Sequence, residues 1–159
     1  MAERRVYMNI YTKLFGEITV DVNKVINFDA GLIGFENCKQ YMLIHDSEKE
    51  EGKIVWLQSI DEPELALPVI DPLVIVPDYN PTVEDELLKT LGEGEDMPLV
   101  LTVITVPQDI TKMTVNLKAP IVINPTLLKG CQMIVEDEGY LVRQPIYDIL
   151  ASNNRKDGE

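Results

Sequence analysis

Apolar residues in this chain recur with a period of two in short, closely spaced runs. In the first run, Val6, Met8 and Ile10 would lie on one face of an extended chain. Tyr7, Asn9 and Tyr11 would lie on the other face. Later runs rich in Val, Ile, Thr and Tyr read GEITV, KVINF, YMLIH, KIVWLQSI, LALPVI, PLVIVP, PLVLTVITVP, MTVNL, PIVIN, CQMIVED and YLVRQ. Alternation of this kind predicts β-strands, because successive side chains of a strand point to opposite faces.

Turn-forming residues separate these runs at short intervals. The connecting stretches read DVN, DAGLIG, SEKEEGK, DEPE, INPTLLKG and EDEG. Many short strands with such spacing are typical of an antiparallel barrel or sandwich. The sequence therefore predicts a mostly β, antiparallel β-barrel-like single domain over residues 1–150, with no internal repeat and no linker.

One helix interrupts the strand pattern, at about 82–91. Thr82 can cap its N-terminus and Gly92 can end it. The stretches GFENCKQ and PIYDIL predict minor helical turns. The polar tail ASNNRKDGE, residues 151–159, is expected to be flexible.

Charge changes the picture of possible partners. The 159 residues include 27 Asp and Glu against 14 Lys and Arg, a net charge of −13. This balance argues against direct nucleic-acid binding, which needs Lys and Arg at the phosphates. It favours basic partners, although acidity can also serve solubility alone.

Cysteine usage and the N-terminus bear on compartment. Cys38 and Cys131 lie far apart, without the spacing of a secreted disulfide scaffold, which favours two free thiols in a reducing compartment over a single bridge. The N-terminal stretch has positive charge but no apolar core of a signal peptide, and no run reaches the length of a membrane span. We therefore expect a cytoplasmic protein without membrane association.

Candidate catalytic groups are few. His45 is the sole histidine and has only Asp46 beside it, so a solvated strand-end histidine is favoured over a general base. One histidine and two distant cysteines are too few for a zinc site, and the acidic stretch EDELLKTLGEGED lacks the calcium-loop pattern. The sequence predicts no catalytic residue, no metal site and no cofactor.

An acidic corner follows the only tryptophan. Asp61, Glu62 and Glu64 surround Pro63 in the stretch WLQSIDEPELALPVIDP, which begins at Trp56. Carboxylates beside an aromatic ring fit a glycosidase-like acid/base pair, a metal site or a contact surface for another protein. The polar and aromatic clusters of a sugar site are missing from the rest of the chain, which favours the contact surface.

Several motifs together resemble one family, the bacterial flagellar assembly factor FliW. They read TKLFGEI, INFDAGLIGFENCKQYMLI, WLQSIDEPELALPVIDP, VPDY, LTVITVPQDITKMTVNLKAPIVIN, KGCQMIV and YLVRQPI, and run from about Thr12 to Ile146. Pro68 and Val115 depart from the residues usual in the family. Pro68 argues for an edge or bulge in its strand.

The resemblance implies a small, mostly antiparallel β-barrel and a function without catalysis. Members of this family bind the RNA-binding translational regulator CsrA and relieve its repression of flagellin mRNA. They also bind flagellin, which competes for them, so the expected partners are a CsrA-type regulator and flagellin. Exchange between two partners depends on relative affinity and concentration. Because CsrA binds RNA and carries basic surface, the acidity of this chain suits it.

Two groups of residues are candidates for partner contact. The first group is Trp56, Gln58, Asp61, Glu62, Pro63 and Glu64; the alternative is a plain acidic turn with Trp56 in the core. The second group is Asn116, Leu117 and Tyr79; the alternative places Leu117 in the core and makes Tyr79 a lid.

A different class of function stays open at this point: an acidic β-barrel that is a ligand- or metal-binding enzyme with an unrecognised pocket. Continuous apolar strands argue for a filled barrel interior without a ligand cavity.

Overall fold

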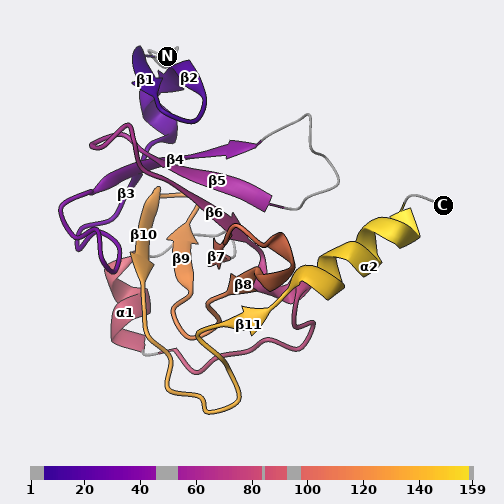
Figure 1. Cartoon of the computed structure of the whole chain (residues 1–159). Coiled ribbons are helices and arrows are strands. Elements are labelled where there is room, and N and C mark those ends of the chain that lie inside the picture. Colours follow the sequence, from indigo (N-terminus) through magenta and orange to yellow (C-terminus); the bar gives the residue numbers. More distant parts are fainter. Residues whose placement is uncertain (1–5, 46–53, 84, 93–97, 158–159) are drawn as a thin grey trace.

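A computed structural model describes residues 6–45, 54–83, 85–92 and 98–157. It contains short strands and two α-helices, and the prediction of a mostly β, antiparallel barrel is confirmed (Figure 1). The strands are β1 Tyr7–Thr12, β2 Gly16–Asp21, β3 Ile26–Asn27, β4 Gln40–His45, β5 Ile54–Ser59, β6 Ala66–Ile70, β7 Leu99–Thr105, β8 Thr114–Val115, β9 Ile121–Asn124, β10 Lys129–Gln132 and β11 Gln144–Pro145. The helices are α1 Asp85–Thr90 and α2 Tyr147–Asp157, with 3-10 turns η1 Val22–Lys24, η3 Pro72–Val74 and η4 Ile110–Lys112.

The main sheet closes on itself. Its strands follow the order β7-β6-β5-β4-β3-β10-β9, and β9 pairs with β7 again, which completes a barrel. Neighbours are antiparallel except β3 and β10, which are parallel. At the C-terminal end of β7, β8 pairs with β7 and β11 pairs with β8.

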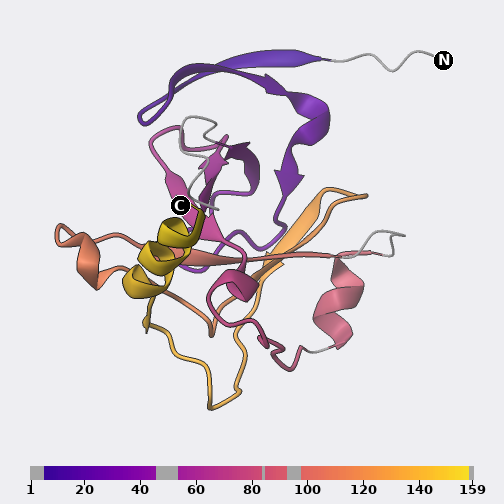
Figure 2. The same cartoon turned by 90° about the vertical axis from the view of Figure 1, so that its right-hand side faces the viewer.

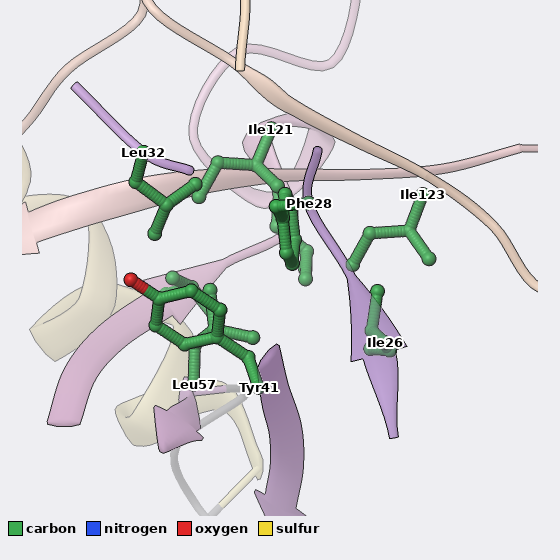
Figure 3. Close-up of a cluster of buried hydrophobic side chains, with 9 residues drawn as sticks. Ile26, Phe28, Leu32, Tyr41, Leu57, Ile121 and Ile123 are labelled. Atoms are coloured by element: carbon green, nitrogen blue, oxygen red, sulfur yellow. The ribbon is translucent and has the colours of Figure 1, made fainter. Parts of the chain in front are cut away.

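The barrel interior is filled by the inward-facing side chains of alternating positions. Figure 3 shows this cluster, in which the rings of Phe28 and Tyr41 meet edge to face with centroids 5.3 Å apart. Gly130 is needed beside them, because a Cβ there would lie 2.4 Å from the Phe28 ring. The buried members are Ile26, Phe28, Leu32, Tyr41, Leu57, Val69, Leu101, Ile121 and Ile123.

The outward faces of the strands bury two further apolar clusters. One is covered by α2, whose Ile149 and Leu150 pack against a cluster that includes Ile146, Ile104 and Val115. The other lies beside α1 and contains Leu91, Val122 and Met133. Helix α2 therefore shields one apolar patch on the outside of the barrel, and Leu91, the residue after α1, covers the other.

Strands β1 and β2 form a separate hairpin that projects from one end of the molecule (Figures 1 and 2). The predicted alternation is present, since Met8 pairs with Val20, and Ile10 pairs with Ile18 on the same face. Burial along this face is uneven, however: Val20 is fully buried, whereas Met8 is 38% exposed. The hairpin is thus only partly covered by the barrel.

The helix predictions need correction in extent. The described part of α1 begins at Asp85, and Glu84 lies outside the described residues. The Thr82 amide and hydroxyl both donate to the Asp137 carboxylate, at 3.1 and 3.2 Å, and capping by Thr82 stays a prediction. Gly92 ends the helix with φ +82°, as predicted.

The prediction of one short helix is incomplete, because the structure has a second helix, α2, which is longer than α1. The boundary predicted at residue 151 falls inside α2, so the stretch before residue 158 is helical. Flexibility of that stretch remains a prediction. The apolar spacing of Ile146, Ile149 and Leu150 is the helical signal in a segment otherwise dominated by polar residues.

One predicted strand is absent from the described structure. The run PLVIVP forms η3 and a turn in place of a strand. Asp71 caps η3 through a hydrogen bond from the Leu73 amide, and Pro72 occupies its first turn, where a missing N–H costs nothing. Pro68 lies in β6 opposite Trp56, ahead of the first β6–β7 pair, Val69 with Val103, so it is locally at an edge as predicted.

Candidate partner-binding surfaces

The acidic corner lies where the tip of the β1–β2 hairpin meets the barrel. The Phe15 ring packs edge to face against Trp56, with centroids 5.9 Å apart. The Lys13 amide donates a hydrogen bond to the Pro63 carbonyl at 3.3 Å. Trp56 is half-buried, so it is neither a core residue nor a free surface anchor. Its outer face is occupied by the hairpin.

Gln58 holds the corner from inside. Its side chain is fully buried, and its Nε2 donates to the carbonyls of Ser59, Pro63 and Leu65 at 2.9, 3.1 and 3.1 Å. A partner cannot contact this side chain in the described structure. Gln58 therefore positions the corner and does not belong to its contact surface.

The three carboxylates of the corner differ in what they do. Asp61 accepts hydrogen bonds from the Lys39 and Gln40 amides at 2.6 and 2.9 Å, so it ties the corner to the start of β4. Glu62 and Glu64 are exposed, and their carboxylates make no hydrogen bond or ion pair with any described residue. Pro63 between them is half-buried. The corner thus offers two unpaired carboxylates on a fixed backbone.

The second predicted group is mostly internal. Leu117 is buried in the cluster beneath α2, which agrees with the alternative that places it in the core. Tyr79 is also buried, and its hydroxyl donates to the Leu117 carbonyl at 2.7 Å. Burial, together with Tyr140 and Asp137 nearby, raises the pKa of Tyr79 well above its usual value. Tyr79 therefore fixes its loop to the barrel as a lid.

Asn116 is the exception in this group, because it is not fully buried. It is half-buried, and it lines a hollow whose volume is about 330 Å³ at one end of the barrel. Its Oδ1 accepts a hydrogen bond from the Lys118 amide at 3.0 Å. None of the acidic-corner residues lines this hollow.

Two residues of the corner are missing from the predicted contacts. Lys13 and Phe15 come from the TKLFGEI motif, and contact the corner across a long stretch of sequence. The signal was present as a tight turn, in which Thr12 Oγ1 donates to Gly16 O and accepts from the Phe15 amide. Nothing in that local pattern indicates which segment the turn packs on.

The described residues that could serve in catalysis or metal binding do not gather into a site. His45 is exposed at the end of β4, and Asp46 lies outside the described residues. Within the described ranges, no three His, Cys, Asp or Glu side chains gather as a metal site would require. Cys38 and Cys131 are free thiols, and burial raises the pKa of the Cys131 thiol. None of the described helices is long and apolar enough to span a membrane.

Comparison with known proteins places this geometry in a family. The model of the family described as FliW protein matches residues 9–146. A flagellar assembly factor FliW of Lachnospira eligens is 55% identical over 146 residues, which cover 90% of this chain and 97% of the relative. One of Lachnoclostridium phytofermentans is 48% identical over 155 residues, covering 96% and 99%.

A solved structure agrees with the sequence relatives. The crystal structure of a flagellar assembly factor FliW superposes with a TM-score of 0.79 at 30% identity, covering 88% of this chain and 97% of that one. Fold, family model and full-length relatives therefore coincide. The chain belongs to the FliW family of flagellar assembly factors.

Proposed function

We propose that this chain is a non-catalytic cytoplasmic protein that exchanges between two partners. One partner is a CsrA-type translational regulator, whose repression of flagellin mRNA it relieves, and the other is flagellin. Family membership supports the flagellar role. The observation that carries the proposal is the acidic corner, with Glu62 and Glu64 unpaired on a backbone that Gln58 and Asp61 hold rigid.

A rigid acidic corner suits a basic RNA-binding partner for two reasons. Its backbone is already ordered, so little conformational entropy is lost when a partner binds. Its unpaired carboxylates add to the field of a chain with net charge −13, which attracts basic surface and disfavours phosphates nearby. If binding of this chain and binding of RNA to the regulator are coupled by about 1–3 kcal/mol, RNA binding would weaken up to roughly a hundredfold.

Titration calorimetry tests this proposal. Purified CsrA-type regulator is titrated into the full chain at low and high salt, and flagellin is then added as competitor. We expect saturable binding that flagellin displaces and that weakens as the salt concentration rises, because salt screens exposed charges. Absence of binding to either partner would refute the exchange, and binding of the regulator that does not depend on salt would refute electrostatic attraction.

A matched pair of variants locates the surface. Glu62→Gln with Glu64→Gln removes both unpaired carboxylates of the corner. Glu136→Gln with Glu138→Gln removes two exposed carboxylates elsewhere and keeps the change in net charge equal. We expect the first variant to lower the affinity and the salt slope, and the second to change them much less. Equal effects would assign binding to net charge and not to the corner.

A further inference from the structure

A hollow opens at one end of the barrel, where β6 and β7 stop pairing. The two strands share only the pairs Val69 with Val103 and Ile70 with Thr102. Val103 of the last pair, together with Leu67 and Thr105 beyond it, lines the hollow of about 330 Å³. That volume lies at the low end of the range of about 300–1,000 Å³ found for ligand pockets.

The wall facing β6 and β7 is a tight turn from Leu32 to Phe35. The two end residues pair through their main chains, and Gly34 adopts φ +88° at the corner. Gln132 braces the turn, since its Oε1 accepts from the Ile33 amide at 2.8 Å and its Nε2 donates to the Ala119 carbonyl at 3.0 Å. The wall is therefore fixed, and both ends of the Gln132 amide are already engaged.

Two side-chain donors line the hollow: Arg143, which is exposed, and Asn116, which is half-buried. Gln144 of β11 pairs with Val115 of β8, and Arg143 and Asn116 are the residues directly outside this pair, both of which line the hollow. The Asn116 Nδ2 group and the Arg143 guanidinium make no hydrogen bond or ion pair with any described residue. Donors left unpaired beside apolar walls favour a ligand that brings acceptors.

The charge of this lining is opposite to that of the whole chain. The lining contains Arg143 but no Asp or Glu, although the chain has 27 acidic residues. Another hollow, of about 420 Å³ and lined in part by Tyr79, instead contains Asp71 and no cation. An arginine in a carboxylate-free lining is complementary to a carboxylate, which its planar guanidinium binds through two parallel hydrogen bonds.

We propose that this hollow binds the free C-terminal end of a protein chain whose last residue is apolar. The apolar side chain packs among Leu67, Val103 and Val142, and the α-carboxylate accepts hydrogen bonds from Arg143 and Asn116. An internal Asp or Glu would supply the charge but leave the apolar walls empty. An internal apolar residue would fill the walls but leave both donors unpaired. The proposal goes beyond the exchange of partners described above and does not depend on it.

An NMR titration of the full, ¹⁵N-labelled chain tests the proposal. The probe is the peptide Gly-Ser-Gly-Ser-Leu with a free carboxylate, compared with its C-terminal amide and with the same peptide ending in Gly. We expect the free acid to shift the side-chain signals of Arg143 and Asn116, and each altered peptide to bind about tenfold more weakly. Equal binding of the amide, or no shift at these side chains, would overturn the proposal.

A small carboxylate probe tests whether the hollow prefers the end of a protein chain over a small-molecule acid. 4-Methylpentanoate has the leucine side chain and the carboxylate but no peptide. We expect it to bind more weakly than the peptide, because it lacks the main chain that continues out of the hollow. Binding as tight as that of the peptide would overturn the assignment to a protein chain end.

Three variants connect the binding to the named groups. Arg143→Gln removes the cation, and Asn116→Asp keeps the acceptor for the Lys118 amide while replacing the Nδ2 donor by a carboxylate oxygen. We expect each to weaken the free-acid peptide about tenfold or more, and the exposed Lys24→Gln control to leave it unchanged. Unchanged binding in both hollow variants would overturn the proposal. Retained calorimetric binding of the CsrA-type regulator by these variants would distinguish this site from the acidic corner.

Discussion

The β1–β2 hairpin and the barrel come from the same alternating pattern but differ in what covers them. Strand β7 pairs with β6, β8 and β9, and its Leu101 is 4% exposed. Strand β1 pairs only with β2, and its Tyr11 is 75% exposed. The difference teaches that alternation specifies a strand with two faces, whereas burial depends on what the rest of the chain brings to each face.

The hairpin is attached at a few points. At its tip Phe15 contacts Trp56, and the Lys13 amide reaches the Pro63 carbonyl. A two-stranded hairpin alone is marginally stable in water. We therefore infer that these contacts hold it, and that it opens more easily than the barrel.

The largest expected effect comes from the barrel interior. Phe28→Ala should lower the free energy of unfolding by about 3–5 kcal/mol, because it empties a fully buried ring site beside Gly130 and Tyr41. Tyr11→Ala in the hairpin should change it by no more than about 0.5 kcal/mol. Urea unfolding of both variants measures the contrast. Equal effects would show that the hairpin and barrel unfold as one equally packed unit.

A smaller effect is expected at the hairpin tip. Phe15→Ala removes the ring contact with Trp56, which is worth about 0.5–1.5 kcal/mol beyond area burial. Amide hydrogen exchange should accelerate in β1 and β2 while β7 and β9 keep their protection. Trp56 fluorescence reports the same change, since this is the only tryptophan. Uniform acceleration over the whole chain would contradict local attachment of the hairpin.

The smallest effect concerns two buried tyrosine hydroxyls. The Tyr41 hydroxyl has no hydrogen-bond partner among the described residues, whereas that of Tyr79 donates to Leu117. At neutral pH Tyr41→Phe should therefore be neutral or slightly stabilising, and Tyr79→Phe should cost about 1 kcal/mol. Thermal unfolding of the two variants measures the difference. An equal loss of stability in both would contradict the view that only the Tyr79 hydroxyl makes a stabilising hydrogen bond.

The same hydroxyls predict how stability depends on pH. Burial raises the pKa of both Tyr41 and Tyr79 above the usual 10.0, so the folded chain retains protons that the unfolded chain has lost. Their contribution is present below pH 10 and declines as pH rises above it. The double Phe variant should show a shallower loss of stability above pH 10. An unchanged slope would exclude this contribution.

Much of the fold was predictable because its signals are local. Alternation predicted β4, β5, β6, β7 and β9 near their observed bounds, and Gly92 marked the end of α1. The run PLVIVP misled because its apolar content resembles a buried strand, whereas Asp71 and Pro72 begin a 3-10 turn. Helix α2 was underestimated because its apolar residues lie only in its first turns.

The candidate site was predictable only in part. The acidic corner was located correctly as a corner, and Glu62 and Glu64 remain exposed as a contact surface would need. Gln58 and Leu117 were placed with the contact residues but are buried. A strand pattern assigns a residue to a face, and cannot tell whether another segment covers that face.

By itself the sequence determined the strand-rich class, the acidic character, the family resemblance and the location of the corner. The tertiary structure decided that Gln58 organises the corner, that the hairpin tip covers Trp56, and that Arg143 and Asn116 line the same carboxylate-free hollow. The reason is physical: propensity and alternation act between near neighbours in the chain. Burial and hydrogen-bond partners instead depend on strand register, which brings residues distant in sequence together.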